Sequence, residues 1–260
     1  MPVPKPVVLC ILDGWGLSDQ TEANAPALAD TPAFDEIMAH GPSAKLITHG
    51  PDAGLPSGQM GNSEVGHTNI GAGRVVAMDL GQIDLAIEDG SFFENDALLA
   101  FIETLKSSGG TAHLMGLVSD GGVHGHIDHI IASLFALTRA GVPVCLHAVT
   151  DGRDVPPKSA AEFIADLVSR LPDGARVATV TGRYFAMDRD NRWNRVGLAY
   201  AAFMQGQGER AESAEAAIAS AYERGETDEF IRPTVIGGYE GVKNKDGFFC
   251  LNFRADRARE

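Results

Sequence analysis

The chain has 260 residues, of which 44% are hydrophobic and 22% charged, a composition typical of a folded globular protein. Its 21 Lys and Arg residues and 35 Asp and Glu residues give a net charge of -14. This acidic balance argues against binding to nucleic acid or to an anionic membrane, because both need a basic surface. We therefore expect that a local cluster of cationic side chains holds any anionic ligand.

The first predicted element is a buried strand over residues 7–12, an apolar run that ends at Asp13-Gly14-Trp15-Gly16. Ligands of α/β proteins bind where strands end, so Asp13 is a candidate metal ligand. On local grounds, capping of the glycine turn explains Asp13 equally well. Thr31-Pro32 then predicts the start of a short helix.

The segment over residues 50–73 is rich in glycine and contains Gly61-Asn62-Ser63-Glu64. Glycines allow close approach to a ligand, and the start of a helix favours phosphate, so Ser63 is a candidate nucleophile. A simple capping role for Ser63 is about as probable from this segment alone. Activation of the hydroxyl needs either His67, the nearest histidine in sequence, or a divalent metal ion.

From about residue 79 the chain alternates between strand-like and helical patterns, which predicts an α/β unit built on a mainly parallel sheet. We expect strands at 112–118, 142–149, 176–181 and 247–253. We expect helices at 127–140, 159–171, 191–205 and, lying on the surface, at 214–222.

Residues 119–129 contain the pattern His124-x-His126-x-Asp128-His129, which alone resembles the zinc signature of metallo-β-lactamase-type hydrolases. That site needs further histidines downstream, and no histidine follows His147. The zinc hydrolase hypothesis therefore fails within this chain. We expect His126 and His129 to face helix neighbours or solvent, whereas His124, preceded by two glycines, can reach a ligand.

Arginines follow the later predicted strands, in residues 151–157, 181–183, 188–192 and 252–259. Arginine binds phosphate or carboxylate with two parallel hydrogen bonds, which lysine cannot do. A surface salt bridge is the better explanation for any one of them, but their recurrence at successive strand ends indicates an anion site. Asp154, next to Arg153, is a candidate proton carrier.

Cys10, Cys145 and Cys250 lie in apolar runs, so we expect buried, reduced thiols in strands and a cytoplasmic protein. No apolar stretch is long enough to span a bilayer, and we expect no signal segment. The chain ends in an arginine-rich loop where a helix should begin, so we expect a piece of a longer protein.

In order along the chain, these segments resemble the cofactor-independent phosphoglycerate mutases. The shared motifs are LDGWG (12–16), GQMGNSEVGHTNIGAGR (58–74), IEDGSFF (87–93), SDGGVHGHIDH (119–129), DGRDVPPKSA (151–160), GRYFAMDRDNRW (182–193), GETDEF (225–230) and NFRADRAR (252–259). Gly125 stands where the family usually has serine. A related phosphatase or phosphopentose mutase is the alternative, but it has no reason to carry the arginine loops.

The resemblance implies an alkaline-phosphatase-like metal domain, of which residues 1–77 are the first part, with an inserted α/β phosphotransferase domain over residues 78–260. It implies interconversion of 3-phosphoglycerate and 2-phosphoglycerate by a monomer without a bisphosphoglycerate cofactor. Two divalent ions, usually Mn²⁺, are implied, with most ligands beyond residue 260. These 260 residues alone are then expected to be inactive.

The resemblance also assigns roles to individual residues. Ser63 is implied as the nucleophile that becomes phosphoserine, and Asp13 and Ser63 as metal ligands. Asp154 is implied as the residue that carries the proton between the two hydroxyls. The implied substrate-binding set is His124, Arg153, Asp154, Arg183, Arg189, Arg254 and Arg257.

Overall fold

The structure, a computed structural model, describes residues 5–55, 58–76 and 78–259. The chain divides into two compact units, Met1–Val76 and Ala77–Glu260, and each is described by itself. The domain boundary expected between residues 77 and 78 stays a prediction, and Ala77 lies outside the described residues.

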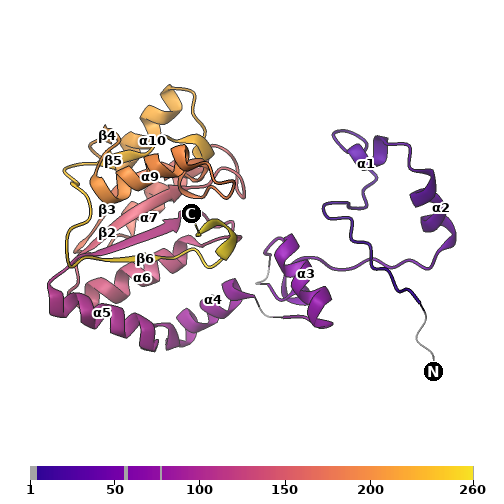
Figure 1. Ribbon diagram of the computed structural model, residues 1–260, viewed down its shortest axis with the longest axis horizontal. Coiled ribbons are helices and arrows are strands. Elements are labelled where there is room, and N and C mark those ends of the chain that lie inside the picture. Colours follow the sequence, from indigo (N-terminus) through magenta and orange to yellow (C-terminus); the bar gives the residue numbers. More distant parts are fainter. Residues whose placement is uncertain (1–4, 56–57, 77, 260) are drawn as a thin grey trace. The chain divides into compact units, whose positions relative to one another are not determined.

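The described part of the first unit contains short helices joined by irregular segments (Figure 1). They are α1 (Ala25–Leu28), α2 (Pro32–His40), the 3₁₀ turn η1 (Pro51–Ala53) and α3 (Ser63–Ala72). Helix α2 begins at the Thr31-Pro32 pair as predicted, because proline at the first helical position lacks only an N–H that would be unpaired anyway.

The buried strand predicted over residues 7–12 is wrong for this structure. The segment has no regular structure, and Val7 and Val8 are 81% and 79% exposed. A strand forms only where a neighbour pairs with its backbone, and the described part of the first unit contains no strand. Cys10 is therefore exposed and outside any strand, contrary to the prediction, whereas Cys145 is buried and Cys250 is partly buried. All three cysteines are free thiols, as predicted.

The second unit begins with three helical elements, α4 (Asp79–Asp89), η2 (Ser91–Glu94) and α5 (Asp96–Ser108). The predicted alternation follows. Its strands are β1 (Ala112–Leu117), β2 (Val144–Thr150), β3 (Ala175–Gly182), β4 (Glu209–Ala211), β5 (Thr234–Ile236) and β6 (Gly247–Cys250). Its helical elements are α6 (Ile127–Arg139), α7 (Ala160–Ser169), α8 (Arg183–Ala186), α9 (Trp193–Gln205), α10 (Ala214–Glu223), η3 (Asp228–Phe230) and η4 (Ala255–Arg257).

The sheet has the strand order β4-β5-β3-β2-β1-β6. Strands β6, β1, β2 and β3 pair in parallel, as do β4 and β5, whereas β3 and β5 pair antiparallel. The mainly parallel α/β fold is therefore confirmed. Parallel strands need helical crossovers, which explains the regular alternation in the sequence.

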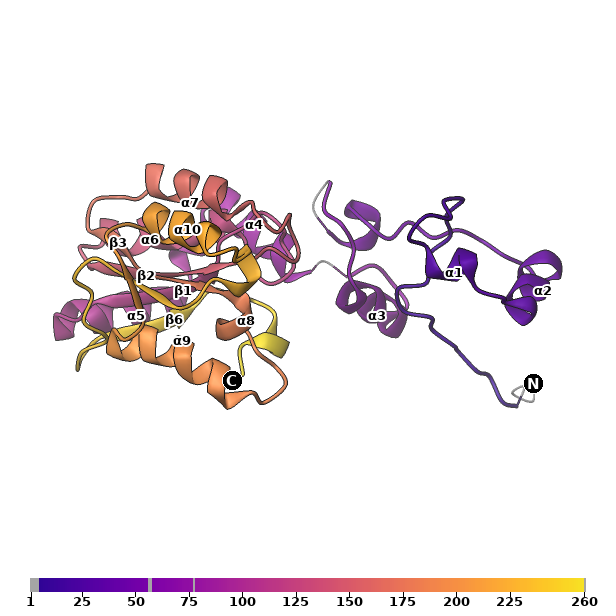
Figure 2. The ribbon, with the colours of Figure 1, turned by 90° about the horizontal axis from the view of Figure 1, so that it is seen from above.

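Helices cover both faces of this sheet (Figure 2). Alternate residues of β2 face opposite sides: Leu146 joins a core with α5, α6, α7 and α10, whereas Cys145 and Val149 join a core with α9. Helix α10, predicted to lie on the surface, nevertheless buries one face that includes Ile218. None of the described helices is long and apolar enough to cross a membrane.

Strand β6 stops earlier than the predicted residue 253. Asn252 interrupts the ladder, because its Oδ1 atom accepts a hydrogen bond from the Leu117 N–H at 3.0 Å. Helices α4 and α5 and the three-residue strands β4 and β5 were not predicted. Such short strands leave too few residues for an alternating pattern to be recognised.

Two buried histidines form a hydrogen-bonded pair inside the sheet. His113 Nδ1 lies 3.1 Å from His147 Nε2, and His113 Nε2 lies 3.2 Å from Asp246 Oδ2. Burial, and secondarily the neighbouring His113, lowers the pKa of His147 to about 3, and burial also lowers the pKa of His113. One nitrogen of the pair must accept, so the pair cannot hold two imidazolium ions and keep its bond.

We predict that acid destabilises this unit below about pH 6.5, the usual pKa of histidine in an unfolded chain. The folded-state pKa values are lowered, so the unfolded chain binds more protons, and stability falls as pH falls. Each histidine that stays neutral costs up to about 1.4 kcal/mol per pH unit. Urea unfolding at pH 7.5 and pH 5.0 measures the loss, which should be smaller in His147→Gln. Equal losses in the two proteins would contradict this account.

Candidate active site

The predicted substrate residues come together because of the direction of the strands. Strands β1, β2, β3 and β6 are parallel, so the loops that follow them leave the same edge of the sheet. Those loops carry His124, the Arg153-Asp154 pair, Arg183, and Arg254 with Arg257. Strand β5 runs antiparallel to β3, so the segment that precedes β5, with η3, also reaches this edge.

Two glycines let η3 approach the ends of β2 and β3. Gly152 has a φ of +68°, and a Cβ atom there would lie 2.7 Å from the Asp228 Cβ. A Cβ on Gly182 would lie 2.4 Å from the Glu229 carbonyl oxygen. A larger residue at either position would push η3 away from the site.

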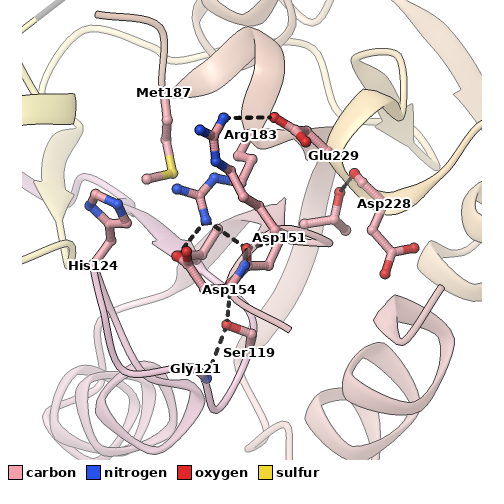
Figure 3. Close-up of polar contacts among 12 residues, drawn as sticks. Ser119, Gly121, His124, Asp151, Asp154, Arg183, Met187, Asp228 and Glu229 are labelled. Atoms are coloured by element: carbon pink, nitrogen blue, oxygen red, sulfur yellow. Dashed lines mark hydrogen bonds and ion pairs between the residues drawn. The ribbon is translucent and has the colours of Figure 1, made fainter. Parts of the chain in front are cut away.

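Arg183 is buried between two carboxylates at the centre of the site (Figure 3). Its Nη1 atom lies 2.6 Å from Asp151 Oδ1 and 2.5 Å from Asp154 Oδ2. Burial opposes the charge, but the two aspartates outweigh it and raise the pKa of Arg183. The guanidinium therefore stays charged and is fixed in one orientation, and it holds Asp154 at the edge of the site.

A pocket of about 370 Å³ lies beside this triad. Five of its lining residues are arginines, namely Arg153, Arg183, Arg189, Arg195 and Arg257. Its acidic lining residues are Asp188, Asp190 and Glu229. Arg153 and Arg189 are about half exposed and pair with Glu229 and Asp256 at 3.4 and 3.2 Å. In a protein of net charge -14, such a concentration of guanidinium groups is suited to an anion with several oxygens.

Arg257 lies among other arginines of this pocket. Burial lowers the pKa of Arg257, and the neighbouring Arg189 and Arg183 lower it further. Its Nη1 atom donates to the Met187 carbonyl oxygen at 3.0 Å. An anion in the pocket would relieve this repulsion, so the electrostatics favour a negatively charged ligand.

His124 and Arg254 meet at Asp256. Asp256 Oδ1 lies 3.7 Å from His124 Nδ1 and 3.1 Å from Arg254 Nε, and Asp256 Oδ2 lies 3.2 Å from Arg189 Nη1. Burial and then Arg183 lower the pKa of His124 to about 4, so it is neutral at pH 7. His124 Nδ1 is buried and has no hydrogen-bond partner among the described residues.

Ser63 lies in the first unit, where it is the exposed first residue of α3. The capping residue of this helix is Asn62, whose Oδ1 accepts from the Val65 N–H at 3.1 Å, so the capping role considered for Ser63 is wrong. His67 Nδ1 donates to the Ser63 carbonyl oxygen at 2.7 Å rather than to the hydroxyl. The hydroxyl is presented at a helix N-terminus, but His67 is not placed to activate it.

Asp13 lies in an exposed turn of the same unit, closed by a bond from the Trp15 N–H to the Leu12 carbonyl oxygen. Carboxylate and hydroxyl oxygens suit a hard divalent ion, but such an ion takes about six ligands. Within the described residues, no three His, Cys, Asp or Glu side chains gather as they would around a metal. Asp13 and Ser63 can therefore supply only part of a metal site.

Two histidines of the zinc-like pattern in residues 124–129, His126 and His129, have structural roles. His126 caps α6, with Nδ1 accepting from the Asp128 N–H at 3.2 Å. His129 is buried, and its Nε2 lies 2.7 Å from Asp84 Oδ1, which ties α6 to α4. The prediction that these two histidines face helix neighbours is consistent with this arrangement.

The sequence reasoning did not single out Asp151, Ser119 or Asp228. Asp228 is fully buried, and its Oδ2 accepts from the Ser159 and Ala160 N–H groups at 2.8 and 2.9 Å, which caps α7. Its Oδ1 accepts from the Tyr222 hydroxyl at 2.5 Å. The sequence indicates these three residues solely through their position within the shared motifs, because the side chains and N–H groups that they contact lie far away in the chain.

The fold and this site define a mainly parallel α/β unit with an arginine-lined pocket at the carboxyl ends of its strands. Residues 83–260 match the family model described as BPG-independent PGAM N-terminus. The chain therefore belongs to the family of BPG-independent phosphoglycerate mutases.

Relatives that match this chain over its whole length are also named as phosphoglycerate mutases. The 2,3-bisphosphoglycerate-independent phosphoglycerate mutases of Dinoroseobacter shibae and Ruegeria pomeroyi are 72% and 70% identical over 260 residues. The chain spans about half the length of these relatives, 52% in both cases. A crystal structure of Leishmania mexicana phosphoglycerate mutase at low cobalt concentration is 32% identical with a TM-score of 0.82, covering 89% of this chain and 46% of that one.

We predict that Asp228→Asn lowers the stability of the second unit by about 2–3 kcal/mol, because an amide that keeps its oxygen toward the Ser159 and Ala160 N–H groups turns its own donor toward the buried Tyr222 hydroxyl, which loses its acceptor. Denaturant unfolding of the variant and parent measures the difference. Ser213→Asn is a matched control, since it keeps a side-chain cap at another helix, where Ser213 Oγ accepts from the Ala216 N–H. Equal stabilities of Asp228→Asn and the parent would show that the cap is unimportant.

Proposed function

We propose that the protein to which these residues belong interconverts 3-phosphoglycerate and 2-phosphoglycerate through a phosphoserine intermediate. The observation that carries the proposal is the pocket of five arginines at the carboxyl ends of parallel strands, with Asp154 held beside it. Family membership supports the same reaction. The related phosphatase reading is weaker, because a simple phosphatase has no need of so many arginines around the rest of its substrate.

In this proposal Ser63 is the nucleophile. Its oxygen attacks in the deprotonated form and makes a bond to the substrate's phosphorus, and the substrate's own oxygen leaves with its pair of electrons and takes up a proton. The phosphoryl group then returns from Ser63 to the other hydroxyl of the glycerate. The N-terminus of α3 favours the charge on the phosphoryl group, because unpaired N–H groups point out of that end of a helix.

The arginine pocket holds the glycerate in the meantime. Arg153, Arg189 and Arg257 supply guanidinium groups to its carboxylate, with Arg183 and Arg254 beside them. His124, neutral at pH 7, contributes a hydrogen bond without adding charge. Asp154 gives a proton to the substrate oxygen that leaves in the first transfer and takes one back from the hydroxyl that receives the phosphoryl group in the second, which is possible because Arg183 binds only one side of its carboxylate.

The complete protein would also hold two divalent ions, with Mn²⁺ as the expected metal. Asp13 and Ser63 are the oxygen donors that this chain contributes. When bound, the ions would stabilise negative charge on the Ser63 oxygen and on the phosphoryl group. We further propose a cytoplasmic monomer, a metal domain that begins with residues 1–77, a substrate domain over residues 78–260, and no activity in these 260 residues alone.

We predict that Ser63→Ala in the full-length protein lowers mutase turnover by at least about a thousandfold, because no other group replaces the nucleophile. Stability should change by no more than about 0.5 kcal/mol, since the side chain is exposed. Turnover of 3-phosphoglycerate and the mass of the Ser63 peptide after acid quench are the measurements. Ser220→Ala, an exposed serine on α10, is the control. Normal turnover in Ser63→Ala would refute the nucleophile assignment.

We predict that Arg153→Lys raises KM for 3-phosphoglycerate about tenfold, the effect of losing one of two parallel hydrogen bonds. Arg232→Lys is a matched control, because the two side chains are 55% and 58% exposed and each pairs with a glutamate, but Arg232 lies outside the pocket. Steady-state kinetics and melting temperature separate binding from stability. The same KM in both variants would assign Arg153 to the surface.

A further inference from the structure

Within the part of the chain that the structure describes, the buried carboxylate of Asp151 accepts hydrogen bonds from Ser119, Arg183 and the backbone of Arg153 and Asp154. Its Oδ1 accepts from Arg183 Nη1 at 2.6 Å, from the Asp154 N–H at 3.0 Å and from the Arg153 N–H at 3.2 Å. Its Oδ2 accepts from the Ser119 hydroxyl at 2.7 Å (Figure 3). One carboxylate therefore touches three predicted site residues at once.

These bonds fix both the backbone and the side chains of the site. The two N–H bonds hold the turn after β2, in which Gly152 has a left-handed conformation. This turn sets the direction in which Arg153 and Asp154 leave the backbone. The bond to Nη1 sets the orientation of Arg183, which in turn binds Asp154. Ser119 joins the loop after β1 to the same carboxylate.

The charges show that Asp151 does more than neutralise Arg183. Asp154 already offers Arg183 a carboxylate, so a single ion pair would be complete without Asp151. Burial of a second carboxylate is unfavourable unless hydrogen bonds compensate for it. Asp151 has four such bonds, and its side chain is 1% exposed, whereas that of Asp154 is 17% exposed. The more buried carboxylate, Asp151, therefore holds Arg183, whereas the more exposed carboxylate, Asp154, faces the site.

We propose that Asp151 is a positioning residue for the phosphoglycerate site, with Ser119 as its support. Asp151 does not contact the substrate. It holds Arg183 and the Arg153-Asp154 turn so that the pocket arginines and the proton carrier meet the glycerate together. This inference rests on the proposed function and adds two residues to it.

Asp151→Asn in the full-length protein tests the proposal. The amide keeps the size of the side chain and an acceptor for the turn but removes the charge that holds Arg183. We expect kcat/KM for 3-phosphoglycerate to fall about a hundredfold, the usual effect of misplacing catalytic groups by about 1 Å. Ser119→Ala should lower kcat/KM in the same direction but by less.

If Asp151 only stabilised the fold, its substitution would not change the pH dependence of kcat/KM. Asp154 bonds with Arg183 and Asp151, and His124, which is neutral at pH 7, lies near it. Removing the negative charge of Asp151 leaves Asp154 as the only carboxylate bound to Arg183 Nη1, so the pH dependence of kcat/KM should differ from that of the parent in Asp151→Asn. Asp228→Asn is the matched control, since it changes an equally buried aspartate that caps α7. It should lower the melting temperature but leave kcat/KM and the profile unchanged well below that temperature.

The proposal is overturned if Asp151→Asn keeps the parent's kcat/KM and pH profile, or if it lowers only the melting temperature as Asp228→Asn does. Should Asp151→Asn fail to fold, Ser119→Ala decides the matter, and parental kinetics in that variant overturn the proposal. The parent and Ser63→Ala are assayed alongside. If the proposed function is wrong, the parent lacks mutase activity or Ser63→Ala keeps it. If only the role of Asp151 is wrong, these two proteins behave as proposed, and Asp151→Asn or Ser119→Ala does not.

Discussion

The site depends on one arginine held between two aspartates. Arg183 joins the carboxyl end of β3 to the turn after β2, and Asp151 and Asp154 share its Nη1 atom. Two carboxylates keep a buried guanidinium charged, and the guanidinium in turn allows one of them to remain buried. Without this arrangement, Arg153 and Asp154 would lie on a turn with no fixed direction. The pocket arginines would then have no common orientation toward a ligand.

The parallel sheet is what makes this arrangement possible. Four parallel strands deliver their following loops to one edge, and the antiparallel β5 brings η3 to the same place. Arginines that are about 100 residues apart in sequence, Arg153 and Arg257, therefore line one pocket. Burial, and then the neighbouring Arg189 and Arg183, lower the pKa of Arg257, and this local concentration of cations favours an anion in spite of the acidic character of the whole chain.

Much of the second unit could be predicted from the sequence, since its long strands and helices have clear periodic patterns. The arginines at the strand ends could also be predicted, because parallel strands place successive loops together. Asp151 and Asp228 could not, because their importance comes from partners such as Arg183 and Ala160 that lie far along the chain. The strand over residues 7–12 was wrongly predicted for a related reason. An apolar run indicates burial, but only a pairing partner makes a strand, and the described part of the first unit has none.

The chain spans about half the length of its relatives, so the proposed reaction belongs to the complete protein. The central claim for these residues is narrower: the arginine pocket binds the glycerate part of the substrate. A crystal structure of the full-length protein with 3-phosphoglycerate tests this directly. The account predicts ligand oxygens within hydrogen-bonding distance of Arg153, Arg189 and Arg257. A ligand bound elsewhere, with these guanidinium groups still paired to protein carboxylates, would contradict it.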